Sequence, residues 1–131
     1  MEPVEINAGP WYLRMPRADD RVDDRPSLAD LGETDPDYVA KTEAGWAEDL
    51  RYLWAVCEPT TGELLAEVAL NPGSGELGVR HRPGHAEAGR TGAEAVGRFA
   101  VAALGLAPAP AFANGPATAD QKPGDAADCQ G

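Results

Sequence analysis

Three apolar runs within residues 52–81 place the strongest constraint on the fold. The first, YLWAVC at 52–57, is almost continuously apolar, which is typical of a buried strand. LLAEVAL at 64–70 and ELGVRH at 76–81 follow it, and the intervening segments EPTTG and NPGSG are rich in turn residues. Because such short connections join antiparallel neighbours, the pattern predicts a three-stranded meander of two hairpins.

The period changes in the stretch HAEAGRTGAEAVGRFAVAALGL at 85–106. Apolar residues recur there at helical spacing, and they are Val96, Phe99, Ala100, Ala103 and Leu104. Gly105 then stands where a helix ends. The sequence therefore predicts a helix from about Gly92 to Gly105, preceded by a glycine-containing loop.

The first half of the chain predicts one strand and short helices. Residues 11–15 (WYLRM) read as a strand before a proline. Ser27 is expected to be the N-cap of a short helix, and residues 43–50 predict a second helix.

Charge and composition narrow the function classes. The net charge is −11, with 22 acidic residues against 11 Lys and Arg, so a general nucleic-acid-binding face is not expected. No apolar run is long enough for a membrane span, and the N-terminal residues do not resemble a signal peptide. These features predict a cytoplasmic location, without a membrane or nucleic-acid partner. Cys57 and Cys129 are expected to be reduced, and Cys57, in an apolar run, to be unreactive.

The composition shifts after the helix. Ala, Pro and Gly supply 15 of the 25 residues at 107–131, and Phe112 is the only large apolar side chain there. Such a segment buries too little apolar surface to offset its ordering entropy. The sequence therefore predicts a domain at 1–106 and a disordered tail at 107–131.

The order of these elements resembles the GNAT family of N-acetyltransferases over about residues 4–106. The stretches that carry the resemblance are WYLRMPRADD, WAVCEPTTGELLAEVAL, GELGVRHRPGH and GRTGAEAVGRFAVAALGL. They are most similar to the branch that acetylates the amino termini of ribosomal proteins and small amines. The resemblance implies an α+β fold with a GNAT-like mixed sheet, mainly its N-terminal antiparallel strands with flanking helices. The family's C-terminal strands are expected to be missing, as if the chain were truncated after the acetyl-CoA-binding helix.

The resemblance implies an acyltransferase activity. It would transfer an acetyl group from acetyl-CoA to a primary amine, on a small molecule or a protein N-terminus. The alternative, from a different class, is a non-catalytic remnant of the family. Such a remnant would act as an interaction or homodimerisation domain through an open sheet edge, or it would be a poorly folded fragment.

A cofactor site is expected at the loop and the helix start. The first turn of a helix has free N–H groups and a partial positive charge, which suit a diphosphate. The residues that the resemblance assigns to acetyl-CoA are Gly78, Val79, Arg80, Gly89, Arg90, Thr91, Gly92 and Ala93. Gly92 matches the family's loop pattern, whereas Glu87 stands where the family has Gln or Arg. The structural alternative is an ordinary helix entry with Thr91 as N-cap and Glu94 three residues later.

Two carboxylates are candidates for the general base. Attack by an amine requires loss of its proton, and the resemblance places strand residues Glu76 and Glu67 near the acetyl carbon. The alternative is that both are ordinary strand residues. Two histidines, His81 and His85, without nearby cysteines or regularly spaced carboxylates, predict no metal site.

Overall fold

The computed structural model describes residues 1–106 and 113–114, and its strands form one mixed sheet. The strands are β1 (Ile6–Ala8), β2 (Trp11–Arg14), β3 (Tyr52–Cys57), β4 (Leu64–Leu70), β5 (Leu77–His81) and β6 (Ala113–Asn114). The helices are α1 (Arg25–Asp30), α2 (Tyr38–Ala47) and α3 (Ala86–Leu104). Strands are neighbours in chain order; β1 to β5 are antiparallel, and β6 runs parallel to β5. The predicted α+β class is confirmed.

The meander at the centre of the sheet is also confirmed. Strands β3 and β4 have the predicted bounds, and β5 begins one residue later than predicted. The delay has a local cause, because the Glu76 carbonyl accepts the Asn71 N–H at 2.9 Å and closes the turn. Gly62 and Gly75 have φ of 76° and 80°, which the two tight turns require and which glycine adopts without steric cost.

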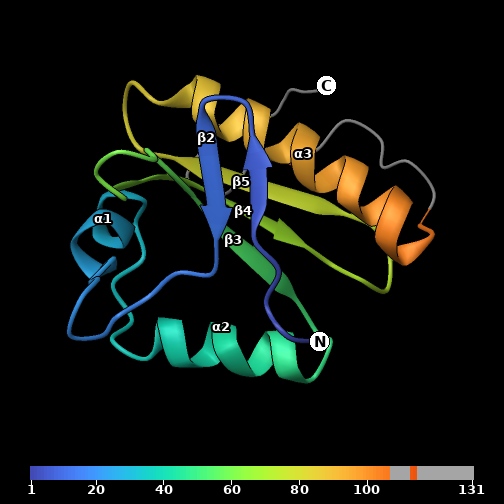
Figure 1. Cartoon of the computed structure of the whole chain (residues 1–131). Helices are drawn as coiled ribbons and strands as arrows, with labels where there is room; N and C mark the ends of the chain where they lie inside the picture. Colours follow the sequence, from blue (N-terminus) through green and yellow to red (C-terminus); the bar gives the residue numbers. More distant parts are fainter. Residues whose placement is uncertain (107–112, 115–131) are drawn as a thin grey trace.

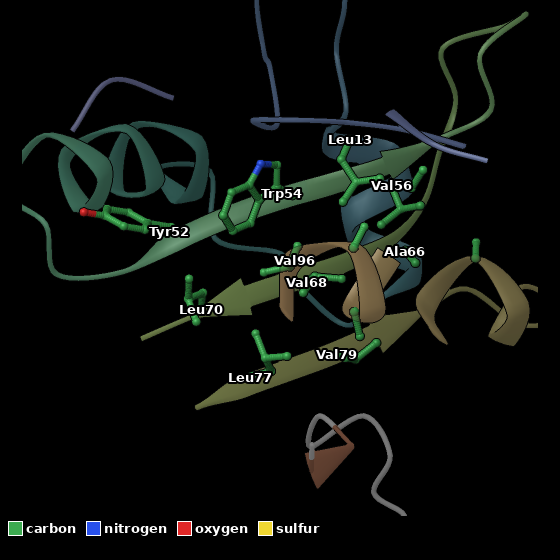
Figure 2. Close-up of a cluster of buried hydrophobic side chains, with 14 of the residues drawn as sticks. Leu13, Tyr52, Trp54, Val56, Ala66, Val68, Leu70, Leu77, Val79 and Val96 are labelled. Carbon is green, nitrogen blue, oxygen red and sulfur yellow. The ribbon is translucent and has the colours of Figure 1, made fainter. Parts of the chain in front are cut away.

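Helices cover both faces of this sheet. Helix α3 lies across one face, and α1 and α2 lie on the other side (Figure 1). The α3 face carries the main core, where Trp54, Val56, Val68 and Val79 gather with Val96 of α3 (Figure 2). Strand alternation turns the residues between them toward α1 and α2.

The sequence did not predict the first hairpin. Strand β1 pairs with β2 through Ile6↔Leu13, and Gly9 at φ 60° makes the turn between them. The run EINAG is short and polar, so its pairing depends on the aromatic strand β2 beside it. The predicted strand at 11–15 is present, one residue shorter.

A buried ion pair fixes where α1 begins. The predicted N-cap Ser27 is wrong, because the N-cap is Asp24, whose side chain does not cap the helix. Its carboxylate instead accepts two bonds from the Arg14 guanidinium, at 2.7 and 3.0 Å, with both side chains under a tenth exposed. Arg14 also donates to the Gly62 carbonyl at 3.1 Å. One pair thus joins β2, α1 and the β3–β4 turn.

Strand β6 extends the sheet after α3. It pairs through Gly78↔Ala113 and Val79↔Asn114, and it completes a β5–α3–β6 crossover. The predicted tail otherwise lies outside the described residues, and the division at residue 106 stays a prediction. In the described part, no helix is both long and apolar enough to cross a bilayer.

Candidate functional site

Helix α3 begins earlier than the sequence predicts. Its first residue is Ala86 and its N-cap is His85, so the predicted N-cap Thr91 is wrong. Gly89 already donates its N–H to the His85 carbonyl at 3.4 Å. The amides of residues 90–93 have carbonyl acceptors one turn earlier, as helix geometry requires. The expected loop is therefore part of the helix, and these four amides are engaged by hydrogen bonds within it.

The two glycines of this segment pack against the sheet. A Cβ added to Gly92 would lie 2.6 Å from Cγ2 of Val56, and one added to Gly89 would lie 3.1 Å from Cγ1 of Val79. Both glycines are buried. Their lack of a side chain lets α3 approach β3, β4 and β5 closely. This close packing explains the two glycines without any phosphate.

The first turn of α3 lies at residues 86–88. The His85 N–H donates to the Arg82 carbonyl at 3.0 Å, and the next three amides have no acceptor inside the helix. Glu87 occupies this turn, and its carboxylate pairs with the guanidinium of Arg90, both exposed. The positive end of the helix is therefore partly neutralised by a carboxylate of its own chain.

Among the described residues, no strand covers the outer edge of β5 beside this turn. Pairing with β6 covers only Gly78 and Val79 in the part of the chain that the structure describes. The Arg82 N–H donates to Leu65 on β4 at 2.9 Å, and antiparallel pairs alternate, so the backbone groups of Arg80 face β4 and those of His81 face away from it. The predicted donors at 78–80 are thus engaged, and His81 offers the outward backbone N–H.

The candidate base Glu67 lies in a buried network. Its carboxylate accepts the Tyr38 hydroxyl at 2.6 Å and the Arg80 Nε–H at 2.8 Å. The Glu67 side chain is 3% exposed and that of Arg80 is 14% exposed. Burial and the nearby Glu67 charge raise the pKa of Tyr38, so this hydroxyl remains protonated and donates. Glu67 therefore holds Arg80 and Tyr38 in place.

The other candidate base, Glu76, lies elsewhere. It is exposed in the β4–β5 turn, and its N–H donates to the Ser74 hydroxyl at 3.2 Å. Glu67 lies opposite Arg80 in the sheet. Arg80 is four residues after Glu76, which separates the two carboxylates by about 13 Å along the strand direction. The structure does not bring the two predicted bases together.

Two residues that sequence reasoning missed complete the network on the α1–α2 side. Tyr38 of α2 stacks under Arg80, with its ring centre 5.7 Å from the guanidinium carbon. Glu33, between α1 and α2, lies 3.5 Å from both terminal nitrogens of Arg80. Sequence reasoning named Glu67 and Arg80 separately and did not pair them. The observed register places them opposite each other, where opposite charges on adjacent strands favour a pair. Nothing local in the sequence indicates Tyr38 or Glu33.

The other cysteine and tryptophan candidates that the structure describes are not gathered into a site. Cys57 is fully buried, and burial raises the pKa of its thiol to about 12, as expected for an unreactive cysteine. Trp46 and Trp54 lie in the core, where Trp46 stacks on Tyr52. Within residues 1–106 and 113–114, no group of three His, Cys, Asp or Glu side chains could hold a metal ion.

Comparison with known proteins adds one structural likeness. No family model matches the sequence, and no curated protein does. A solved structure from Vibrio cholerae, provisionally described as a ribosomal-protein-serine acetyltransferase, is similar with a TM-score of 0.63 at 18% sequence identity. The similarity covers 81% of this chain and 72% of that one. The chain thus shares its fold with a GNAT-type acetyltransferase.

Proposed function

We propose that this chain binds acetyl-CoA and transfers the acetyl group to a primary amine. The observation that carries the proposal is the outward backbone of β5 at His81, which no strand within residues 1–106 and 113–114 covers and which lies between the described β6 pairing and the first turn of α3. A thioester carbonyl placed there could accept the outward His81 N–H. The diphosphate could meet the amides of residues 86–88.

The reaction is a direct acyl transfer. The neutral amine attacks the thioester carbon, a C–N bond forms, the C–S bond breaks, and coenzyme A leaves as a thiol after taking up a proton. Glu67 has its two oxygens occupied by Tyr38 and Arg80. Removal of the amine proton therefore falls to a water or to the amine's own equilibrium with solvent, since the buried Glu67 carboxylate is already engaged by Tyr38 and Arg80.

The first test is calorimetric titration of the folded chain with acetyl-CoA. Glu87→Gln removes a carboxylate from the turn assigned to the diphosphate, so we expect it to tighten binding by about two- to fivefold. Glu94→Gln makes the same charge change at an exposed position farther along α3 and should have little effect. Gly92→Glu is unsuitable as a binding test, because a side chain there would collide with Val56.

The acetyl-transfer step needs its own assay. We expect coenzyme A thiol to be released in the presence of a peptide with a free N-terminal serine, the acceptor suggested by the name of the Vibrio cholerae protein. If acetyl-CoA binds but no thiol is released with any of the peptides or small amines, the transfer step is contradicted and only the cofactor site remains supported.

A second candidate is a non-catalytic domain with the acetyltransferase fold. Continuous helix at residues 89–93 and the Glu87 carboxylate in the first turn favour it, because together they leave less positive potential for a diphosphate. For this candidate, the calorimetric titration should show no heat of acetyl-CoA binding, although the protein is folded and unfolds cooperatively. The same titration therefore separates the two functions.

A further inference from the structure

We propose that the outer face of the Arg80 guanidinium is a carboxylate-binding site, which Glu33 occupies loosely in the free protein. The site faces the α1–α2 side of the sheet. Arg80 is the neighbour of His81, whose backbone carries the proposed function.

The inner side of the guanidinium is firmly held. Arg80 Nε donates to Glu67 at 2.8 Å, and one terminal nitrogen lies 2.7 Å from the same oxygen. That nitrogen also lies 3.1 Å from the Tyr38 hydroxyl, whose ring supports the guanidinium. These contacts fix the plane and direction of the fork, as a recognition site requires.

The outer side is poorly satisfied. A single Glu33 oxygen lies 3.5 Å from both terminal nitrogens, which is the outer limit of a hydrogen bond. A well-placed carboxylate would use two oxygens and make two parallel bonds at about 2.7–2.9 Å. One terminal nitrogen already contacts Glu67 and Tyr38, whereas the other contacts, among the described residues, only Glu33 at this long distance. That second nitrogen therefore has unused capacity to donate to a ligand.

Glu33 itself is only lightly restrained. It follows Gly32, whose φ is 92°, in the connection between the two short helices. Its other oxygen accepts the Asp35 N–H at 3.4 Å, again a long contact, and its side chain is 22% exposed. A ligand carboxylate could displace Glu33 without breaking a strong bond, so Glu33 acts as an internal competitor.

The ligand class follows from these contacts. It is a molecule with a carboxylate, and, resting on the proposed function, one that also carries a primary amine: a free amino acid or a peptide with an acidic side chain near its N-terminus. The chain has a net charge of −11, so general attraction of anions does not explain such binding.

The test is an NMR titration of the full chain that follows the Arg80 Nε–H and backbone amides. The probes are L-alanine, its amide without the carboxylate, and a Ser-Asp dipeptide amide. We expect one or both carboxylate probes to shift Arg80 and Glu33, and L-alaninamide not to. Glu33→Gln should raise the affinity for the responding probe by about tenfold, because the competing carboxylate is removed.

Matched variants separate a specific role of Glu33 and Arg80 from a general effect of charge. Glu43→Gln makes the same charge change on exposed α2 and should alter affinity less than about twofold. Arg80→Lys keeps the charge but loses the fork, and binding should disappear while cooperative unfolding remains. Equal affinities in Glu33→Gln and Glu43→Gln, unchanged binding in Arg80→Lys, or probe shifts confined to Arg82 or α3 would overturn the proposal.

The outcomes also separate this site from the proposed function. Carboxylate binding at Arg80 without any acetyl-CoA binding would support the site and contradict the enzyme. Acetyl transfer in which neither carboxylate probe reacts faster than L-alaninamide would support the enzyme and overturn the carboxylate site.

Discussion

Single positions along α3 differ sharply in the room they leave for a side chain. A Cβ at Gly92 would lie 2.6 Å from a methyl group of Val56, whereas one at Gly97 would have its nearest contact at 3.9 Å, with Leu77. Val56 is fully buried, and valine is stiff at χ1, so it cannot turn aside cheaply. The same chemical substitution should therefore have opposite effects at the two glycines.

We predict that Gly92→Ala lowers the free energy of unfolding by about 1–2 kcal/mol, since overpacking outweighs the gain in helix propensity. Gly97→Ala should raise it by about 0.5–1 kcal/mol. Urea denaturation of both variants measures the difference. Equal stabilities would show that α3 does not lie as close to β3 as described.

Cys57 offers a second prediction for a single residue. Its thiol is fully buried and has a pKa of about 12, against roughly 8.5 for a free cysteine. In a Cys129→Ser background, a disulfide reagent at pH 8 should modify Cys57 only through unfolded molecules. The reaction rate should then rise with urea in parallel with the unfolded fraction; fast labelling without urea would contradict the buried position.

At the scale of elements, β2, the three strands of the meander and the amphipathic stripe of α3 were predictable because local patterns determine them, whereas β1 and β6 were not predicted. The start of α3 was not, since Gly89 and Gly92 suggest a loop until the sheet that they contact is known. The proposed site was only half predictable for the same reason. Glu67 and Arg80 were each named as candidates from the sequence, but their pairing depends on a strand register that the structure supplies. Glu33 comes from a connection whose path depends on tertiary packing.

The pair Arg14–Asp24 is the clearest test of how elements are joined. Asp24→Asn leaves a buried guanidinium short of its counter-charge, and we expect a loss of about 3–5 kcal/mol in unfolding free energy. Asp23→Asn is the matched control, because Asp23 pairs with Arg25 on the surface, where both side chains are largely exposed. A double-mutant cycle with Arg14→Met measures the coupling. Similar losses for Asp23→Asn and Asp24→Asn would contradict the linking role.

For the whole molecule, the pH dependence of stability should have an acid and an alkaline limb. Backbone N–H groups of Val22 and Arg21, then Arg17, lower the pKa of Asp19 to about 2. A lowered folded-state pKa adds stability above the unfolded value, near 3.9, and this stability is lost as the pH falls toward 2. Asp23, Asp35 and Asp49 also have lowered pKa values and act in the same direction.

The alkaline limb has the opposite sign. Burial, then a hydrogen bond to Asp49, raises the pKa of Tyr52 to about 12, and burial raises that of Cys57 similarly. Their stabilisation is present below the unfolded pKa values and is lost as the pH rises past them. We predict that the melting temperature is highest near neutral pH. Between about pH 4 and 2, the melting temperature of Asp19→Asn should fall less steeply than that of the parent chain. Parallel acid limbs would contradict the role given to Asp19.

The β5–β6 pairing also bears on the order in which the molecule assembles. Each hairpin of the meander closes over seven positions, as Cys57↔Leu64 and Leu70↔Leu77, whereas Gly78 must meet Ala113, 35 positions later. Distant closures cost more chain entropy and form more slowly. The meander and α3 can therefore assemble first, and the edge of β5 that carries the proposed chemistry takes its final shape last.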